Sequence, residues 1–216
     1  IAWADQPLPD TRLPIAPPQR RVSPPSHYDH ALLLHMSKVD IEALSAAFDD
    51  VVARHEPLRT VLVERDGELF QELSEASLEV EEVTGDLAQR AAELARRTLD
   101  LSEHPPLRAR LLTRADGRRA LLLAMHYTGV DEWSTVPLFR DLSTAYAARR
   151  RGEEPDWHPL PVSYADYTRW YRELLGDPSD PGSKYAGQLR YWTHALDGMP
   201  EELPLPTDRT GPEEAA

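Results

Sequence analysis

Hydrophobic positions follow two different periods along the chain, and each period predicts one kind of element. Residues 41–52 carry apolar side chains at helical spacing with acidic residues between them, and Pro57 ends this pattern. The apolar runs 28–36 and 120–126 are instead short and continuous, which is typical of buried strands. Because helix and strand patterns are mixed along the chain, the sequence predicts an α/β sandwich built on a largely buried sheet.

Asp-Gly dipeptides, which favour tight hairpin turns, separate two pairs of apolar segments. The expected hairpins join 58–64 to 68–73 and 107–113 to 120–126. The other expected elements are a strand at 78–83 and helices at 86–99, 134–150, 163–175 and 183–196. The proline-rich residues 1–26 and the tail 201–216 are expected to be extended and without regular structure, which places the folded core within 27–200.

Composition narrows the classes of function. The 216 residues include 37 acidic and 24 basic side chains, for a formal net charge of −13, so nucleic acids and anionic membranes are not expected partners. The absence of cysteine excludes disulfides, thiolate nucleophiles and cysteine-based metal sites. Without a membrane-length apolar run or a leader, we expect a cytoplasmic protein. The scarcity of lysine and the absence of asparagine suggest a GC-rich bacterium of the actinobacterial type.

The strongest candidate for chemistry stands at the end of the predicted central strand. His126 closes the run 120–126, and Asp131 follows across a loop that contains Gly129. Ligands in α/β folds tend to bind outside strand ends, where a histidine can act as a general base or a hydrogen-bonding anchor. Asp131 could orient His126 or pair with an arginine. A purely structural role for His126 remains equally open.

Arg54 and Arg59 lie close together where the helix of residues 41–52 gives way to the next strand. Cations at the C-terminal end of a helix complement its dipole, which is sufficient reason for both of them. The functional alternative is that one of the two arginines reaches Asp131.

Other clusters are assigned structural roles. The group formed by His27, Asp29, His30 and His35 is not expected to bind a metal, because His30 points to the opposite face of a strand from the other three. The tryptophans of the chain's second half are expected to be core or packing residues at helical and loop junctions: Trp133, Trp157, Trp170 and Trp192. The sequence contains no phosphate-binding loop, dinucleotide fingerprint or zinc-protease motif.

A series of short segments, taken in order, resembles the condensation domains of nonribosomal peptide synthetases. The segments are ARHEPLRTVLVE, PPLRARLL, MHYTGVDEWS, LPVSYADYTRWYRE, QLRYWTHALDGMP and LPLPTDR. The resemblance implies a chloramphenicol-acetyltransferase-like α/β sandwich, and complete domains of this family pair two such lobes in a V. Residues 27–200 would then be the N-terminal lobe, and 201–216 a linker to a C-terminal lobe outside this sequence.

The family's core motif, His-His-x-x-x-Asp-Gly, reads MHYTGVDE here. The resemblance gives His126 the catalytic role and gives Asp131 a structural one through Arg54 or Arg59. Met125 replaces the first histidine, and because it points away from His126 we expect it to pack in the core. Glu132 replaces the glycine, which adds bulk and charge beside the substrate, unless it merely favours the N-terminus of the following helix.

Three functions are compatible with the resemblance, and Glu132 leaves open whether the domain is an active enzyme. An active domain would join an aminoacyl amine to a peptidyl thioester, both delivered on the phosphopantetheine arms of carrier proteins, without a metal or a directly bound cofactor. An inactive one would resemble the domain that recruits cytochrome P450 enzymes in glycopeptide antibiotic synthesis, in which an acid also replaces the motif glycine. A third alternative is an epimerase-type relative in which His126 would move an α-proton.

Overall fold

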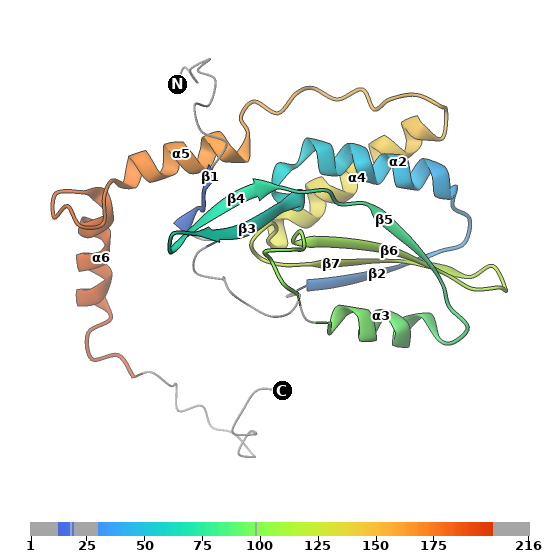
Figure 1. Ribbon diagram of the computed structural model, residues 1–216, viewed down its shortest axis with the longest axis horizontal. Coiled ribbons are helices and arrows are strands. Elements are labelled where there is room, and N and C mark those ends of the chain that lie inside the picture. The colour runs from blue at the N-terminus through green and yellow to red at the C-terminus, as the bar shows by residue number, and fades with distance from the viewer. Residues whose placement is uncertain (1–12, 18, 20–29, 98, 201–216) are drawn as a thin grey trace. The chain divides into compact units, whose positions relative to one another are not determined.

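A computed structural model describes residues 13–17, 19, 30–97 and 99–200 (Figure 1). The chain forms two compact units, residues 1–172 and 173–216. The first unit contains both β-sheets, and the second contains α6 (Lys184–Ala195), while α5 (Tyr164–Leu175) runs across the division. None of the helices within the described residues reaches the length and apolar character that a membrane span requires.

Two sheets form the first unit. The four-stranded sheet has the order β2 (His30–Met36), β7 (Arg119–Met125), β6 (Leu107–Thr113) and β5 (Leu78–Glu82). The three-stranded sheet has the order β1 (Leu13–Pro14), β4 (Glu68–Leu73) and β3 (Thr60–Arg65). All neighbours are antiparallel except β5 and β6, which are parallel. The apolar run 120–126 therefore supplies a central strand, β7, that is paired on both sides.

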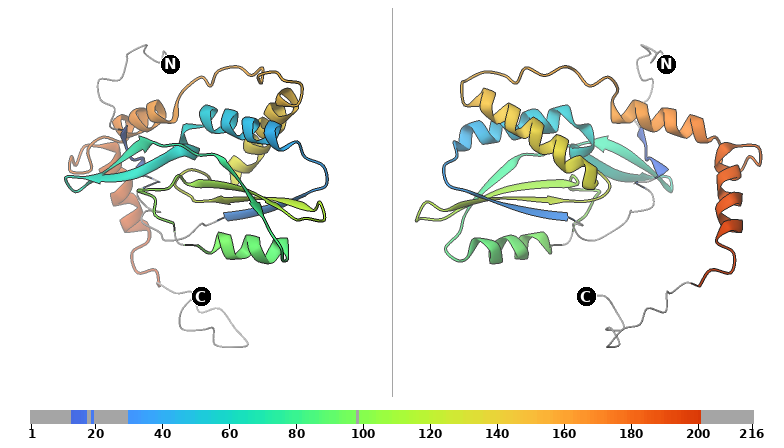
Figure 2. Two further views of the ribbon diagram at one scale, coloured as in Figure 1. Left: turned by 45° about the vertical axis from the view of Figure 1, so that its right-hand side comes forward. Right: turned by 180° about the vertical axis from the view of Figure 1, so that it is seen from behind.

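Helices cover both faces of the four-stranded sheet, with α2 (Ile41–Arg54) and α4 (Thr135–Arg149) on one side and α3 (Leu87–Ala95) on the other (Figures 1 and 2). Alternate residues of β7 divide between these faces. Leu121, Leu123 and Met125 join the core formed with α2 and α4. Ala120 and Leu122 join the core formed with α3. Burial on both faces explains why this strand is apolar without alternation.

Side-chain caps fix where the helices begin, because an oxygen that precedes a helix accepts one of its unsatisfied N–H groups. Asp40 accepts from the backbone of Ala43 at 3.1 Å at the start of α2. Asp86 accepts in the same way for α3 at 2.9 Å. Ser163 accepts from the backbone N–H of Asp166 at 3.0 Å before α5, and its hydroxyl donates to the Asp166 carboxylate at 2.9 Å.

The predicted elements are confirmed in kind and order, with three differences. β1 gives regular structure to a segment expected to have none, because it pairs with the edge of β4 that β3 leaves open. α3 ends at Ala95, earlier than expected. Trp133 and Trp192 are not core residues, since they are 87% and 57% exposed, although Trp192 packs edge-on against Tyr191. The expected tail, 201–216, lies outside the described residues.

The central strand should carry a large share of the stability. Replacing Leu123, which is 1% exposed, by alanine should lower the free energy of unfolding by about 3 kcal/mol, through lost burial and the cavity left behind. Leu73→Ala is the matched control, since this leucine is 51% exposed and should change stability by less than about 0.5 kcal/mol. Chemical denaturation of the two variants measures both values, and equal losses would contradict this account of the core.

Candidate functional site

His126 lies directly after β7, and its side chain is fully buried. Its backbone N–H donates to the carbonyl oxygen of Pro106 at 2.8 Å, which extends the β6–β7 pairing by one more bond. Its carbonyl oxygen accepts from Gly129 at 3.0 Å and Val130 at 3.3 Å, closing a tight turn. We call residues 126–131 the motif loop. His126 is thus fixed by the strand before it and by the turn after it.

The imidazole of His126 is held by Thr128. The backbone N–H of Thr128 donates to Nδ1 at 3.0 Å, and the Thr128 hydroxyl lies 2.9 Å from the same nitrogen. A ring nitrogen that accepts from a backbone N–H carries no proton itself. The neutral ring therefore holds its proton on Nε2, and this tautomer is set by hydrogen bonding.

Gln19 braces the motif loop from a distant part of the chain. Its side-chain amide donates to the carbonyl oxygen of Thr128 at 2.9 Å and to Gln71 of β4 at 3.1 Å. Its own oxygen accepts from the backbone of Ala16 at 2.8 Å. Sequence analysis missed Gln19, because 109 residues separate it from Thr128 and a single glutamine in a proline-rich segment carries no local signal.

Gly129 is required by close packing. A side chain at this position would overlap the ring of Pro106, and its Cβ would lie 2.7 Å from the carbonyl oxygen of Pro57. Real Cβ atoms do not approach a carbonyl oxygen so closely. Only glycine lets the motif loop pass between these two prolines.

Asp131 does not pair with Arg54, contrary to one of the two pairings expected. One carboxylate oxygen of Asp131 instead accepts from the backbone N–H and the hydroxyl of Ser134, at 2.9 and 2.7 Å. Arg54 directs its Nε to Asp141 on α4 at 3.0 Å. The physical reason is proximity: α2 packs on α4, so the buried Asp141 meets the end of α2, while Asp131 lies exposed beside its own local donors.

Arg59 also forms no ion pair with Asp131 among the residues that the structure describes. Asp131 therefore acts here as the cap of the short helix η2 (Glu132–Ser134), in a reciprocal box with Ser134. Its structural role is thus local to the motif loop.

The two departures from the family motif lie in different surroundings. Met125 is 2% exposed in the core beneath α2 and α4, as predicted. Glu132 is exposed at the start of η2 and accepts from the hydroxyl of Tyr127 at 2.9 Å. Its own backbone N–H and this hydroxyl hold the pKa of the Glu132 carboxyl below its usual range, so the residue is charged at neutral pH.

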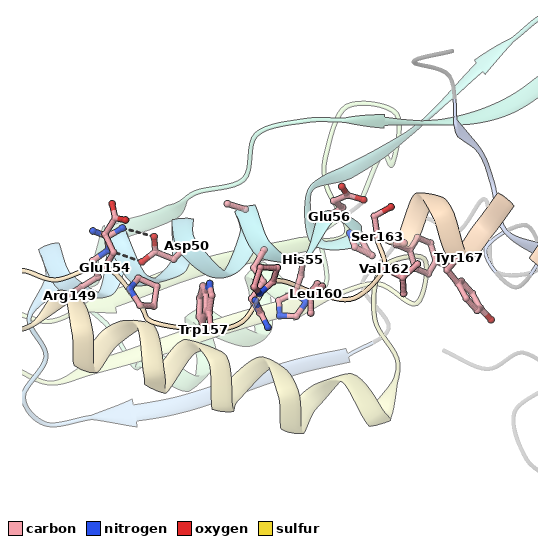
Figure 3. A pocket seen from close by; sticks show the side chains of 16 residues that line it. Asp50, His55, Glu56, Arg149, Glu154, Trp157, Leu160, Val162, Ser163 and Tyr167 are labelled. Atoms are coloured by element: carbon pink, nitrogen blue, oxygen red, sulfur yellow. Dashed lines mark hydrogen bonds and ion pairs between the residues drawn. The ribbon is translucent and has the colours of Figure 1, made fainter. Parts of the chain in front are cut away.

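Two hollows border the motif loop. One, of about 580 Å³, is lined by the motif-loop backbone together with Tyr127, Glu132, Tyr164 and Tyr167. Burial raises the pKa of Tyr164 to about 12, with help from the neighbouring Tyr167 and Asp131, so its hydroxyl stays protonated. The other, of about 210 Å³, is lined by Gly129 and Val130 together with Pro57 and Tyr164. A third hollow, of about 820 Å³, runs along the end of α2 and the proline-rich connection 154–163 and is lined by no residue of the motif loop (Figure 3).

The described residues also include histidine, aspartate and glutamate side chains, which are of the types that could bind a metal ion. Within residues 13–17, 19, 30–97 and 99–200, no three histidine, aspartate or glutamate side chains come together in a way that could hold a metal ion. His27 and Asp29 lie outside the described residues. His30 and His35 both lie on β2, where they pair with Met125 and Ala120 of β7.

Comparison with protein families gives the motif its context. The family model of the condensation domain matches residues 20–216, which is most of the chain. The chain belongs to the condensation-domain family. The expected family and α/β sandwich are thereby confirmed.

Relatives of this condensation domain include the isonitrile lipopeptide synthase of Mycobacterium tuberculosis, 45% identical over 93% of the chain. The dimodular nonribosomal peptide synthase of Bacillus subtilis is 40% identical over 94% of the chain. The chain spans only 9% of the length of each. A solved complex of the X-domain and OxyB from teicoplanin biosynthesis is 30% identical with a TM-score of 0.80, covering 96% of this chain and 48% of that one.

The packing at Gly129 can be tested by adding one methyl group. Gly129→Ala should lower the free energy of unfolding by about 1–3 kcal/mol, because either Pro106 or the Pro57 backbone must move. Gly85→Ala is the control, since nothing lies within 4 Å of a Cβ built there. Urea denaturation distinguishes them, and an unchanged midpoint for Gly129→Ala would show that the motif loop has room to spare.

Proposed function

We propose that this condensation domain contributes His126 to amide-bond formation between two carrier-bound substrates. The amine of an aminoacyl group attacks the carbonyl carbon of a peptidyl or acyl thioester. The C–N bond forms and the C–S bond breaks, while the amine loses a proton and the departing thiolate gains one. Both substrates would arrive on phosphopantetheine arms, and a second lobe would complete the site, since the chain spans about half of the X-domain structure.

The hydrogen bond from Thr128 to Nδ1 carries this proposal and defines the role of His126. With Nδ1 accepting, the neutral ring presents an N–H at Nε2. Such a donor suits the oxyanion that develops when the thioester carbonyl becomes tetrahedral. The attacking α-amine has an ordinary pKa of about 7.7–8.0 and needs little help from a base. His126 would therefore act as a hydrogen-bond donor, and the positioning of both substrates would supply much of the rate.

The role of donor can be separated from that of base by two substitutions in the intact two-lobed protein. His126→Ala should lower kcat for amide formation about 100-fold, the usual cost of losing one oxyanion donor. His126→Gln should retain more activity than His126→Ala, because an amide can donate a hydrogen bond but cannot serve as a base at neutral pH. Both would be assayed with loaded carriers, following the amide product by mass spectrometry.

His35→Gln is the matched control, since His35 lies exposed on β2, and it should keep full activity. Unchanged product with His126→Ala would refute a role in catalysis. Equal losses in His126→Ala and His126→Gln would refute the donor role in particular.

A second candidate function, a recruitment platform for a cytochrome P450, is favoured by a different observation. The imidazole of His126 is fully buried, so a substrate can reach it only after the covering residues move. Beside it the surface is apolar and charged: Trp133 and Val136 are 87% and 75% exposed next to the ionised Glu132. The X-domain neighbour was solved in complex with OxyB, a cytochrome P450, at a TM-score of 0.80.

The platform function predicts where binding energy lies. In the intact protein, Trp133→Ala should weaken binding of a cytochrome P450 of the OxyB kind about tenfold or more, because a large exposed aromatic often dominates an interface. Val80→Ala, which shortens a side chain on β5 that is 51% exposed, should leave the affinity unchanged. Calorimetry measures both values.

Amide formation by the Glu132→Gly variant, with none by the unaltered protein, would identify Glu132 as the group that suppresses condensation.

A further inference from the structure

Asp141 of α4 is a buried carboxylate with three side-chain partners. Its Oδ2 accepts from Arg54 Nε at 3.0 Å and His55 Nε2 at 2.9 Å, and its Oδ1 accepts from Arg140 Nε at 2.9 Å. The residue is 5% exposed. Burial raises its pKa, but the hydrogen bonds from His55, Arg140 and Arg54 outweigh burial and hold the pKa of the Asp141 carboxyl below its usual range. An ionised carboxylate only accepts hydrogen bonds, so His55 must donate from Nε2.

The contact with His55 leads directly to the motif loop. His55 immediately precedes the short helix η1 (Glu56–Arg59), which contains Pro57. The carbonyl oxygen of Pro57 is one of the two groups that leave no room for a side chain at Gly129. Gly129 in turn donates its backbone N–H to the carbonyl oxygen of His126 at 3.0 Å. Each step from Asp141 to His126 is a direct contact or a short covalent connection.

The contact between Asp141 and Arg54 connects Asp141 to the proline-rich connection 154–163. Arg54 also donates to the carbonyl oxygen of His158 at 2.8 Å, and its guanidinium lies 4.8 Å from the ring centre of Trp157. Both residues belong to the proline-rich connection that continues to Tyr164 at the start of α5 (Figure 3). Tyr164 lines both of the hollows that border the motif loop. One carboxylate thus fixes two segments that approach the loop from different directions.

From these contacts we propose that Asp141 is a positioning residue, which sets the conformation of the motif loop through His55 and Pro57 on one side and Arg54 and the proline-rich connection on the other. Its effect on catalysis rests on the proposed amide-forming function. Its effect on the conformation of His126 does not.

A second ion pair between the same helices provides a matched control. Arg149 of α4 holds Asp50 of α2 through two bonds of 2.7 and 2.6 Å (Figure 3). Arg149 is the last residue of α4, whereas the motif loop precedes the first turn of that helix. Losing either pair should weaken the packing of α2 on α4, but only Asp141 connects to the motif loop.

The decisive experiment compares Asp141→Asn with Asp50→Asn in this chain. Both should lower Tm by several degrees, since each leaves an arginine without its partner. Only Asp141→Asn should change the ¹⁵N spectrum of His126, with its two ring-nitrogen signals moving toward each other as the tautomer fixed by Thr128 becomes mixed. His126→Gln, which removes the signals, assigns them. His55→Gln provides a milder break in the same network, and should shift the signals in the same direction if Asp141→Asn does not fold.

Kinetics in the intact two-lobed protein provide the second measurement. Asp141→Asn should lower kcat about 10- to 100-fold with little change in KM, as expected when a catalytic group is misplaced, while Asp50→Asn changes kcat less than about twofold. Unchanged His126 signals in both Asp141→Asn and His55→Gln, despite a lower Tm, would overturn the proposal and leave Asp141 a stabilising residue only. A further outcome is that Asp141→Asn shifts the His126 signals while the unaltered two-lobed protein forms no amide. That result would uphold the positioning role and refute the proposed amide-forming activity.

Discussion

Gly129 lies where three backbone segments meet at a spacing that leaves no room for a side chain. The ring of Pro106 closes one side, just before β6, and the carbonyl oxygen of Pro57 in η1 closes the other. The turn after His126 can form its two backbone hydrogen bonds only if the chain passes between these groups. This close packing at Gly129 sets the position of His126. It also sets the tautomer imposed by Thr128 and the cap that Asp131 provides.

The packing of α2 on α4 keeps the motif loop rigid at Gly129. The interface is mainly apolar, with Phe48 and Val51 facing Leu138 and Leu142 in one core. A buried carboxylate such as Asp141 is tolerated there because its oxygens receive bonds from three charged or polar side chains. These bonds are directional, unlike the apolar contacts, so they fix how the end of α2 meets the motif loop rather than only how strongly the two helices adhere.

Met125 and Glu132, the two departures from the motif that the resemblance implies, have unequal chemical weight because the first is buried and the second is exposed. Met125 occupies core volume beneath the helices, where an apolar side chain suits its surroundings better than an imidazole would. Glu132 adds a fixed negative charge at the exposed start of η2, held by Tyr127, beside the surface that a substrate or a partner protein would approach. Under the proposed functions, the balance between condensation and recruitment would therefore depend on the surface near the site rather than on the core of the lobe.

The sequence by itself determined the elements, their order and the position of His126, because hydrophobic period, Asp-Gly turns and helix caps act over a few residues. It also placed Met125 in the core, since side chains on a strand alternate between faces. Only the tertiary structure decided that Arg54 pairs with Asp141 and not with Asp131, ten residues earlier in the chain. The packing of α2 on α4 brings Arg54 to Asp141 across 87 residues of chain. The contact of Gln19 with Thr128 is likewise long-range and spans 109 residues. Such pairings depend on how distant segments meet in space, and no local pattern records them.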